Sequence, residues 1–174
     1  RQACPTPATS CQVVATTAPF GVVITASHNP AGFNGVKVKD ATGASAGTAL
    51  TIACENQIPP APAALLGMAE AKRLGLVEEV SFDPAHRERL SRMVDLQGIR
   101  NAGFAVVTDP MHGACGDLLA GMLNGGTTTV TTIHADPDPL FGGLHPEPLE
   151  QNLAALRDTV TRLGASVGFA TDGD

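Results

Sequence analysis

Residues 104–133 read FAVVTDPMHGACGDLLAGMLNGGTTTVTTI, and they decide the fold class of this chain. The apolar run at 104–108 and the threonine- and valine-rich run at 127–133 are typical of strands, and segment 116–126 between them suits a helix. Strands separated by a helix of this length indicate a βαβ unit with a parallel sheet. The chain therefore belongs to the α/β class.

The same alternation continues toward the carboxyl terminus. A stripe of apolar residues at steps of four and three predicts a helix over 148–164, which Gly164 is expected to end. A strand over 166–171 follows it. The stripe consists of Leu149, Leu153, Leu156, Val160 and Leu163.

The amino-terminal part is expected to form a separate α/β unit. Its predicted elements are helices over 5–17, 48–58 and 81–98 and strands over 21–25 and 36–38, with a Pro-rich hinge at 58–64. In the helix over 81–98, Asp83 suits the N-cap, Gly98 suits the end, and His86 is expected on a solvated face.

The whole is predicted to form two consecutive three-layer α/β units with mainly parallel mixed sheets. The first unit covers 1–97 and is incomplete at its amino terminus, and the second covers 98–174. In such sheets, ligands bind at the carboxyl ends of the strands. The second unit ends just after a strand, where a site is expected.

Composition narrows the possible partners. The 174 residues are 43% hydrophobic with a formal net charge of −6, and no basic stripe is present that could follow a nucleic-acid backbone. No apolar run approaches the roughly 18 residues of a membrane span, and no signal-like segment opens the chain, so a cytoplasmic protein is expected. The four cysteines are irregularly spaced, which favours free thiols over a zinc site or a disulfide framework.

A polar loop follows the strand over 21–25 and carries the first candidate chemistry. It reads TASHNP at 25–30, and Ser27 stands directly after the apolar run. A connection whose Ser and Asn side chains only satisfy turn amides is one interpretation. A serine hydrolase is excluded, because the nucleophile elbow G-x-S-x-G is missing. An oxygen nucleophile or a phosphoester at Ser27 is the other interpretation.

The terminal TDGD at 171–174 carries the second candidate. Asp172 and Asp174 stand two residues apart after a strand, and carboxylates at this spacing can turn toward one hard cation such as Mg²⁺. A plain surface turn is the alternative, and an EF-hand does not fit the pattern. An oxygen nucleophile in one unit and a cation held by acids in the next are what phosphoryl transfer requires.

Segment 21–38, GVVITASHNPAGFNGVKV, closely resembles the active-site segment of the α-D-phosphohexomutases, the family of phosphoglucomutase and phosphomannomutase. The resemblance continues in the right order over nearly the whole chain. The supporting segments are PTP at 5–7, VVTDPMHGA at 106–114, DPLFGGLHPEPLEQNL at 138–153 and GFATDGD at 168–174.

The resemblance implies a role for each matching residue. Ser27 matches the serine that carries and donates the phosphoryl group, and with Asp172 and Asp174 it matches ligands of Mg²⁺. Lys37 matches a lysine that assists proton transfer or neutralises charge, and His28 belongs to the loop of Ser27 and is expected to orient that loop.

The implied activity is interconversion of hexose 1-phosphate and hexose 6-phosphate through a bisphosphorylated sugar. Thr25, before Ala26, favours glucose or mannose over glucosamine as the sugar. The third metal aspartate, the following arginine and the sugar-reading domains of the family are not in residues 1–174. We therefore expect this segment alone to be inactive and the missing domains of the same polypeptide to be its partners.

Two alternatives remain open at this point. One is a non-catalytic phosphosugar-binding or regulatory homologue that keeps the α/β fold without phosphoserine chemistry. The other is a phosphatase of the HAD type, which the aspartates fit less well, because its nucleophilic aspartate follows the first strand whereas these close the chain.

Overall fold

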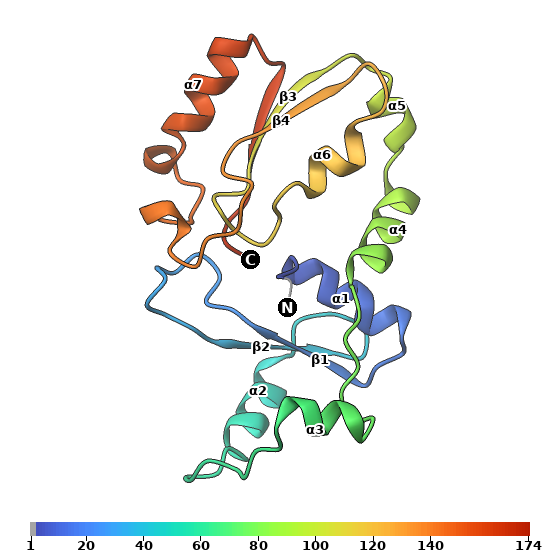
Figure 1. The fold of residues 1–174 in the computed structure, drawn as a ribbon, viewed down its shortest axis with the longest axis vertical. Coiled ribbons are helices and arrows are strands. Elements are labelled where there is room, and N and C mark those ends of the chain that lie inside the picture. Colours follow the sequence, from blue (N-terminus) through green and yellow to red (C-terminus); the bar gives the residue numbers. More distant parts are fainter. Residues whose placement is uncertain (1–2) are drawn as a thin grey trace.

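The computed structural model describes residues 3–174 and has the α/β architecture that the sequence predicts (Figure 1). Its strands form a two-stranded sheet, β1-β2, and a three-stranded sheet in the order β4-β3-β5. The strands are β1 (Phe20–Ile24), β2 (Val36–Asp40), β3 (Ala105–Asp109), β4 (Thr129–Thr132) and β5 (Val167–Ala170). The α-helices are α1 (Thr6–Ala15), α2 (Thr48–Glu55), α3 (Met68–Arg73), α4 (Asp83–Met93), α5 (Leu96–Arg100), α6 (Leu118–Leu123) and α7 (Ala154–Leu163). Two short 3₁₀ turns, Phe141–Gly143 and Glu150–Asn152, precede α7.

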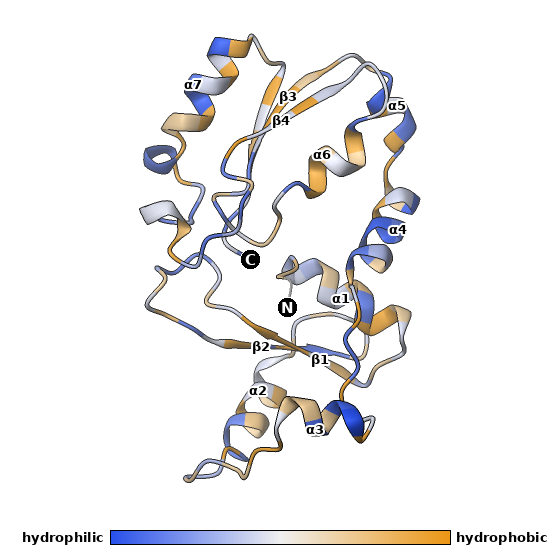
Figure 2. Cartoon of the chain, viewed as in Figure 1, coloured by the Kyte–Doolittle hydropathy of each residue, from blue (hydrophilic) through white to orange (hydrophobic). Residues whose placement is uncertain are grey.

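The three-stranded sheet is parallel, as expected for βαβ units, with β3 at its centre. Helix α7 packs on β3 and β5 on one side, and α6 packs on β4 on the other, which gives three layers (Figure 1). Hydrophobic residues occur in both β3 and α6 (Figure 2), and Val106 and Val107 of β3 are buried. Because β3 and β5 are parallel neighbours, their carboxyl ends lie side by side, next to residues 171–174.

Helix α7 is shorter than the sequence predicts. It begins at Ala154 instead of residue 148, because the Asn152 carboxamide donates to the Glu147 carbonyl oxygen at 2.8 Å and holds the preceding segment in a turn. Leu156 is buried, whereas Leu149 and Leu163, at the ends of the expected stripe, are each 45% exposed. Gly164 ends the helix in the left-handed conformation with φ 58°, as predicted.

The amino-terminal sheet differs from the mainly parallel arrangement expected for both units. Strands β1 and β2 pair antiparallel, with Val22 opposite Val38, and the loop over 25–35 joins them. Helix α1 packs on this pair, where its buried Val13 side chain lies beside Gly21 of β1. The pair and its helix present the loop of Ser27 toward the second sheet (Figure 1).

The helix predicted over 81–98 is two helices. α4 starts with Asp83 inside its first turn, so Asp83 is not the N-cap, and its carboxylate pairs with Arg87 at 2.6 Å. Val94 is extended and stops α4, and the Asp95 side chain then accepts the N–H of Gly98 at 2.9 Å and caps α5. Gly98 lies within α5 because the capping aspartate is a stronger local signal than the glycine.

The environment of His86 differs from the solvated helix face that the sequence predicts. His86 was expected on a solvated face, but only 7% of it is exposed, because α4 packs against α1. Its Nδ1 is buried without a hydrogen-bond partner among residues 3–174. Burial lowers the pKa of His86; the negative charge of Asp83 opposes this shift and the positive charge of Arg87 adds to it.

Within residues 3–174, no helix is both long enough and apolar enough to cross a bilayer. The four cysteines Cys4, Cys11, Cys54 and Cys115 are free thiols, as predicted.

The burial of His86 predicts an acid-sensitive fold. Above its unfolded-state pKa of about 6.5, both states are neutral and stability is complete. As the pH falls below that value, the unfolded state binds a proton that the folded state does not, so the free energy of unfolding decreases. His86→Leu should lose less stability than the unsubstituted protein between about pH 7 and pH 5. Urea unfolding at several pH values measures the difference, and parallel pH profiles would contradict the assignment.

Candidate active site

The loop of Ser27 has a strained and internally bonded backbone. Ser27 has φ 56°, a left-handed conformation that residues other than glycine adopt at a cost of about 1 kcal/mol or more. The Thr25 hydroxyl accepts the Ser27 N–H at 2.9 Å, and the Thr25 N–H donates to the Gly35 carbonyl oxygen at 3.0 Å. These bonds turn the Ser27 side chain out of the strand direction and toward the second unit.

The loop of Asp172 and Asp174 is held from behind by the end of β3. Asp109 is 2% exposed; its carboxylate accepts the Met111 N–H at 2.8 Å and lies 3.0 Å from Nδ1 of His134. The backbone oxygen of Asp109 accepts the Thr171 N–H, and Ala114 donates its N–H to the Gly173 carbonyl oxygen, both at 3.1 Å. The terminal loop is thereby fixed to the β3 edge.

The two loops meet at Ser27. Its Oγ lies 3.1 Å from Oδ2 of Asp172 and 3.3 Å from Oδ1 of Asp174. The backbones approach closely at Gly173, where a Cβ atom would lie 3.0 Å from the Ser27 carbonyl oxygen and 3.0 Å from the Phe141 ring. Only glycine allows this approach without displacing one of the loops.

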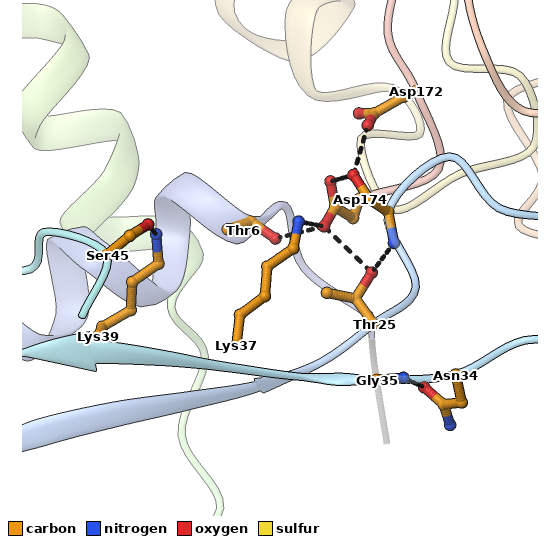
Figure 3. Close-up of polar contacts among 10 residues, drawn as sticks. Thr6, Thr25, Asn34, Gly35, Lys37, Lys39, Ser45, Asp172 and Asp174 are labelled. Carbon is orange, nitrogen blue, oxygen red and sulfur yellow. Dashed lines mark hydrogen bonds and ion pairs between the residues drawn. The ribbon is translucent and has the colours of Figure 1, made fainter. Parts of the chain in front are cut away.

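Asp174 is the most heavily bonded group of the site (Figure 3). Its Oδ2 accepts from Lys37 Nζ at 2.6 Å, from the Thr6 hydroxyl at 3.0 Å and from the Thr25 hydroxyl at 3.1 Å. Partial burial raises the pKa of the Asp174 carboxyl, but the hydrogen bonds from Lys37, Thr6 and Thr25 and the charge of Lys37 outweigh burial, so its pKa lies below its usual value. Asp174 is therefore held as a carboxylate.

Four of the five sequence-predicted site residues are brought together. Ser27, Lys37, Asp172 and Asp174 form one bonded group across the two units. His28 is half-exposed and makes no hydrogen bond to Ser27 among the described residues; its Nε2 lies 3.9 Å from Oε1 of Glu147 in the second unit. Its side chain therefore faces the segment before α7 and not the serine.

Sequence reasoning missed several residues that build this group. Thr6 and Thr25 bond to Asp174, and Asp109 supports the loop behind it. Threonines in a turn and at a helix start carry no signal of a partner more than 140 residues away. Asp109 stands at the end of a strand, which is the position where sheet sites form, and this position was the signal available for it.

The side-chain atoms that meet at this site are oxygen donors, the type of ligand that a hard divalent cation binds. The hydroxyl of Ser27 and the carboxylates of Asp172 and Asp174 are oxygen donors, which Mg²⁺ prefers, and Lys37 is the one cation that pairs with them in the described chain. No group of three or more His, Cys, Asp or Glu side chains that could hold a metal ion occurs in residues 3–174. Any metal here would thus use Ser27 or its phosphate as a third protein ligand.

An open pocket of about 410 Å³ lies beside Ser27. Its walls come from the Ser27 loop, including Asn29 and Phe33, and from Pro139, Phe141 and Gly173 of the second unit. The pocket places both polar and apolar groups within reach of a ligand that touches Ser27.

Two sequence families match this chain. Residues 1–61 match a family described as phosphoglucomutase/phosphomannomutase, alpha/beta/alpha domain I, and residues 84–174 match its alpha/beta/alpha domain II.

Proteins named phosphoglucosamine mutase and phosphoglucomutase/phosphomannomutase are similar to this chain. The probable phosphoglucosamine mutase of Methanobrevibacter smithii is 34% identical over 162 residues, covering 88% of this chain and 33% of that protein. The phosphoglucomutase/phosphomannomutase of Thermococcus kodakarensis is 31% identical over 170 residues, covering 98% of this chain and 37% of that protein. The chain spans about a third of the length of these curated relatives.

A solved structure supports the same relationship. A crystal structure described as that of a phosphomannomutase from Thermus thermophilus superposes with a TM-score of 0.83 at 34% identity, covering 98% of this chain and 38% of that one.

The close approach at Gly173 predicts a specific steric effect. Gly173→Ala should lower the free energy of unfolding by about 1–3 kcal/mol, because the added methyl meets the Ser27 backbone and the Phe141 ring. It should also speed hydrogen exchange at the Ala114 amide, which donates to Gly173. Gly32→Ala is the matched control, since nothing lies within 4 Å of its added methyl. Equal stabilities of the two variants would contradict the contact between the loops.

Proposed function

The chain belongs to the phosphoglucomutase/phosphomannomutase family, and from this premise we propose that it carries the phosphoryl-transfer centre of a phosphohexomutase. The observation that carries the proposal is the approach of Ser27 Oγ to Asp172 and Asp174, with Lys37 paired to Asp174. A nucleophilic hydroxyl, two carboxylates and a lysine in contact suit the positioning and charge neutralisation that phosphoryl transfer needs.

In the proposed reaction, Ser27 carries a phosphoryl group and gives it to a hexose monophosphate. The bond between Ser27 Oγ and phosphorus breaks and a bond from a sugar hydroxyl to phosphorus forms. The sugar hydroxyl loses one proton and Ser27 Oγ gains one, so the serine hydroxyl is restored and the step balances. The resulting bisphosphate reorients, and its other phosphoryl group returns to Ser27. The net change moves phosphate between C1 and C6.

Charge determines the roles of the neighbouring residues. A phosphoserine adds a charge of about −1.5 to −2 next to two carboxylates. Lys37 donates to Asp174 at 2.6 Å, so its ammonium group is placed to neutralise that charge. Mg²⁺, on which the family generally depends, would be held by Ser27, Asp172 and Asp174 and would supply the remaining positive charge. His28 orients the Ser27 loop through its contact with Glu147.

The sugar is proposed only as a hexose or hexosamine phosphate. Thr25 was expected to favour glucose or mannose, but its hydroxyl is used within the site, by the Ser27 N–H and by Asp174. A serine at this position would offer the same hydroxyl, so residue 25 does not distinguish glucose or mannose from glucosamine. Proteins named phosphoglucosamine mutase are also among the relatives.

Sugar recognition is proposed to lie in further domains of the same polypeptide, since the relatives are about three times as long. Residues 1–97 and 98–174 are proposed as the two domains of this segment. The packing of α4 on α1 and of α5 on α6 supports a division close to that position. A cytoplasmic location is proposed from the free thiols.

The proposal predicts a modified serine. The full-length protein purified from cells should carry one phosphoryl group by intact mass, and Ser27→Ala should carry none. Conversion of the 1-phosphates of glucose, mannose and glucosamine to 6-phosphates, in the presence of Mg²⁺ and the matching bisphosphate, should fall by about 10⁴-fold or more in Ser27→Ala.

Ser45→Ala provides the control, because the Ser45 hydroxyl accepts from Lys39 and is not among the hydrogen-bond partners of the Asp172 and Asp174 side chains in residues 3–174. It should keep both the phosphoryl group and the activity. An unmodified protein that converts none of the three sugars would support a non-catalytic homologue and refute the proposal.

A further inference from the structure

The two oxygens of the Asp174 carboxylate have different surroundings. Oδ2 accepts three hydrogen bonds, from Thr6, Thr25 and Lys37, at 3.0, 3.1 and 2.6 Å. Among the hydrogen bonds of residues 3–174, Oδ1 accepts one, from Ser27 Oγ at 3.3 Å. Since a carboxylate oxygen offers about two lone-pair positions, three donors more than fill Oδ2 and fix the orientation of the carboxylate, and the loss of any one of them loosens that orientation.

We propose that Thr6 and Thr25 are positioning residues that reserve Oδ1 of Asp174 alone for the cation, and that they thereby make the site selective for Mg²⁺ over Ca²⁺. This inference rests on the proposed function, which places a divalent cation beside Ser27. Ca²⁺ takes six to eight oxygens and often binds both oxygens of one carboxylate, whereas Mg²⁺ requires a compact octahedron. A carboxylate with one blocked oxygen disfavours the larger ion.

Thr6 is placed for this role by the start of α1. It is the first residue of the helix, between Pro5 at the N-cap and Pro7 in the first turn, so its backbone has little freedom. The helix is anchored on the β1-β2 sheet by the buried Val13, which lies beside Gly21 of β1. The Thr6 hydroxyl is thus held by a rigid helix and reaches Asp174 of the second unit (Figure 3).

The direction of the Thr25 hydrogen bond is fixed by its neighbours. Its oxygen already accepts the Ser27 N–H at 2.9 Å, and its single proton is directed to Asp174. Thr25 therefore couples the orientation of Asp174 to the backbone of Ser27. Replacing Thr25 would disturb both residues, so Thr6 offers the cleaner test.

The experiment measures the binding of MgCl₂ and of CaCl₂ by calorimetry in the full-length protein. Thr6→Val keeps the shape of the side chain and removes the donor. The Kd for Mg²⁺ should rise about tenfold, as is typical for losing a partner that orients a ligand. The Kd for Ca²⁺ should change less, so selectivity for Mg²⁺ should fall by about threefold or more.

Two further variants guard against misfolding. Thr6→Ser keeps the hydroxyl and should retain the Mg²⁺ affinity and the selectivity of the unsubstituted protein. Thr9→Val makes the same chemical change one turn further along α1, where Thr9 is buried and does not reach Asp174, and it should leave both constants unchanged. If Thr6→Val does not fold, Thr6→Ala is compared with Thr6→Ser in its place.

The outcomes separate the inference from the proposed function. Equal loss of Mg²⁺ and Ca²⁺ affinity in Thr6→Val, or no change in either, overturns the inference and leaves the proposed function standing. An unsubstituted protein that binds neither ion refutes the metal site of the proposed function, and the inference falls with it.

Discussion

The close contact between the Ser27 loop and the Asp172–Asp174 loop is the constraint on which the rest of the structure depends. It joins a hydroxyl from an antiparallel strand pair to carboxylates at the end of a parallel sheet, over distances of 3.1 and 3.3 Å. Gly173 makes this contact sterically possible, and the bonds from Asp109 and Ala114 hold its loop in place. Each half of this group of side chains is built by its own unit, and the group forms only where the two units meet.

Electrostatics gives this junction its asymmetry. Lys37, Thr6 and Thr25 all bond to one oxygen of Asp174, whereas Asp172 faces the Ser27 hydroxyl without a charged partner among the described ion pairs. The hydrogen bonds and the lysine keep the pKa of Asp174 low in spite of its partial burial. The site therefore concentrates negative charge around Ser27, which suits a cation and a phosphoryl group brought there together.

Much of the fold follows from local signals in the sequence. The apolar run that forms β3 and the glycine that ends α7 are predicted correctly, because strand composition and a left-handed helix cap depend on few neighbours. His86 is placed wrongly because its burial comes from the packing of α4 on α1, which has no local signature. Gly98 is misassigned because the Asp95 cap overrides a glycine stop.

The site shows the same division between local and distant information. Ser27, Lys37, Asp172 and Asp174 are recognisable from motifs, and the structure brings them together. The donors Thr6 and Thr25 and the contact of His28 with Glu147 depend on how the two units face each other, which no motif encodes. The unforeseen donors Thr6 and Thr25 bond to Asp174, a residue that its motif identifies.

The most direct test of a shared cation site is the position of Mn²⁺, located by anomalous diffraction in crystals of the full-length protein. Mn²⁺ favours the same oxygen ligands as Mg²⁺. The account predicts one peak within about 2.0–2.3 Å of oxygen atoms from Asp172, Asp174 and Ser27 or its phosphate. A peak bound by one loop alone, or at a place remote from Ser27, would contradict it.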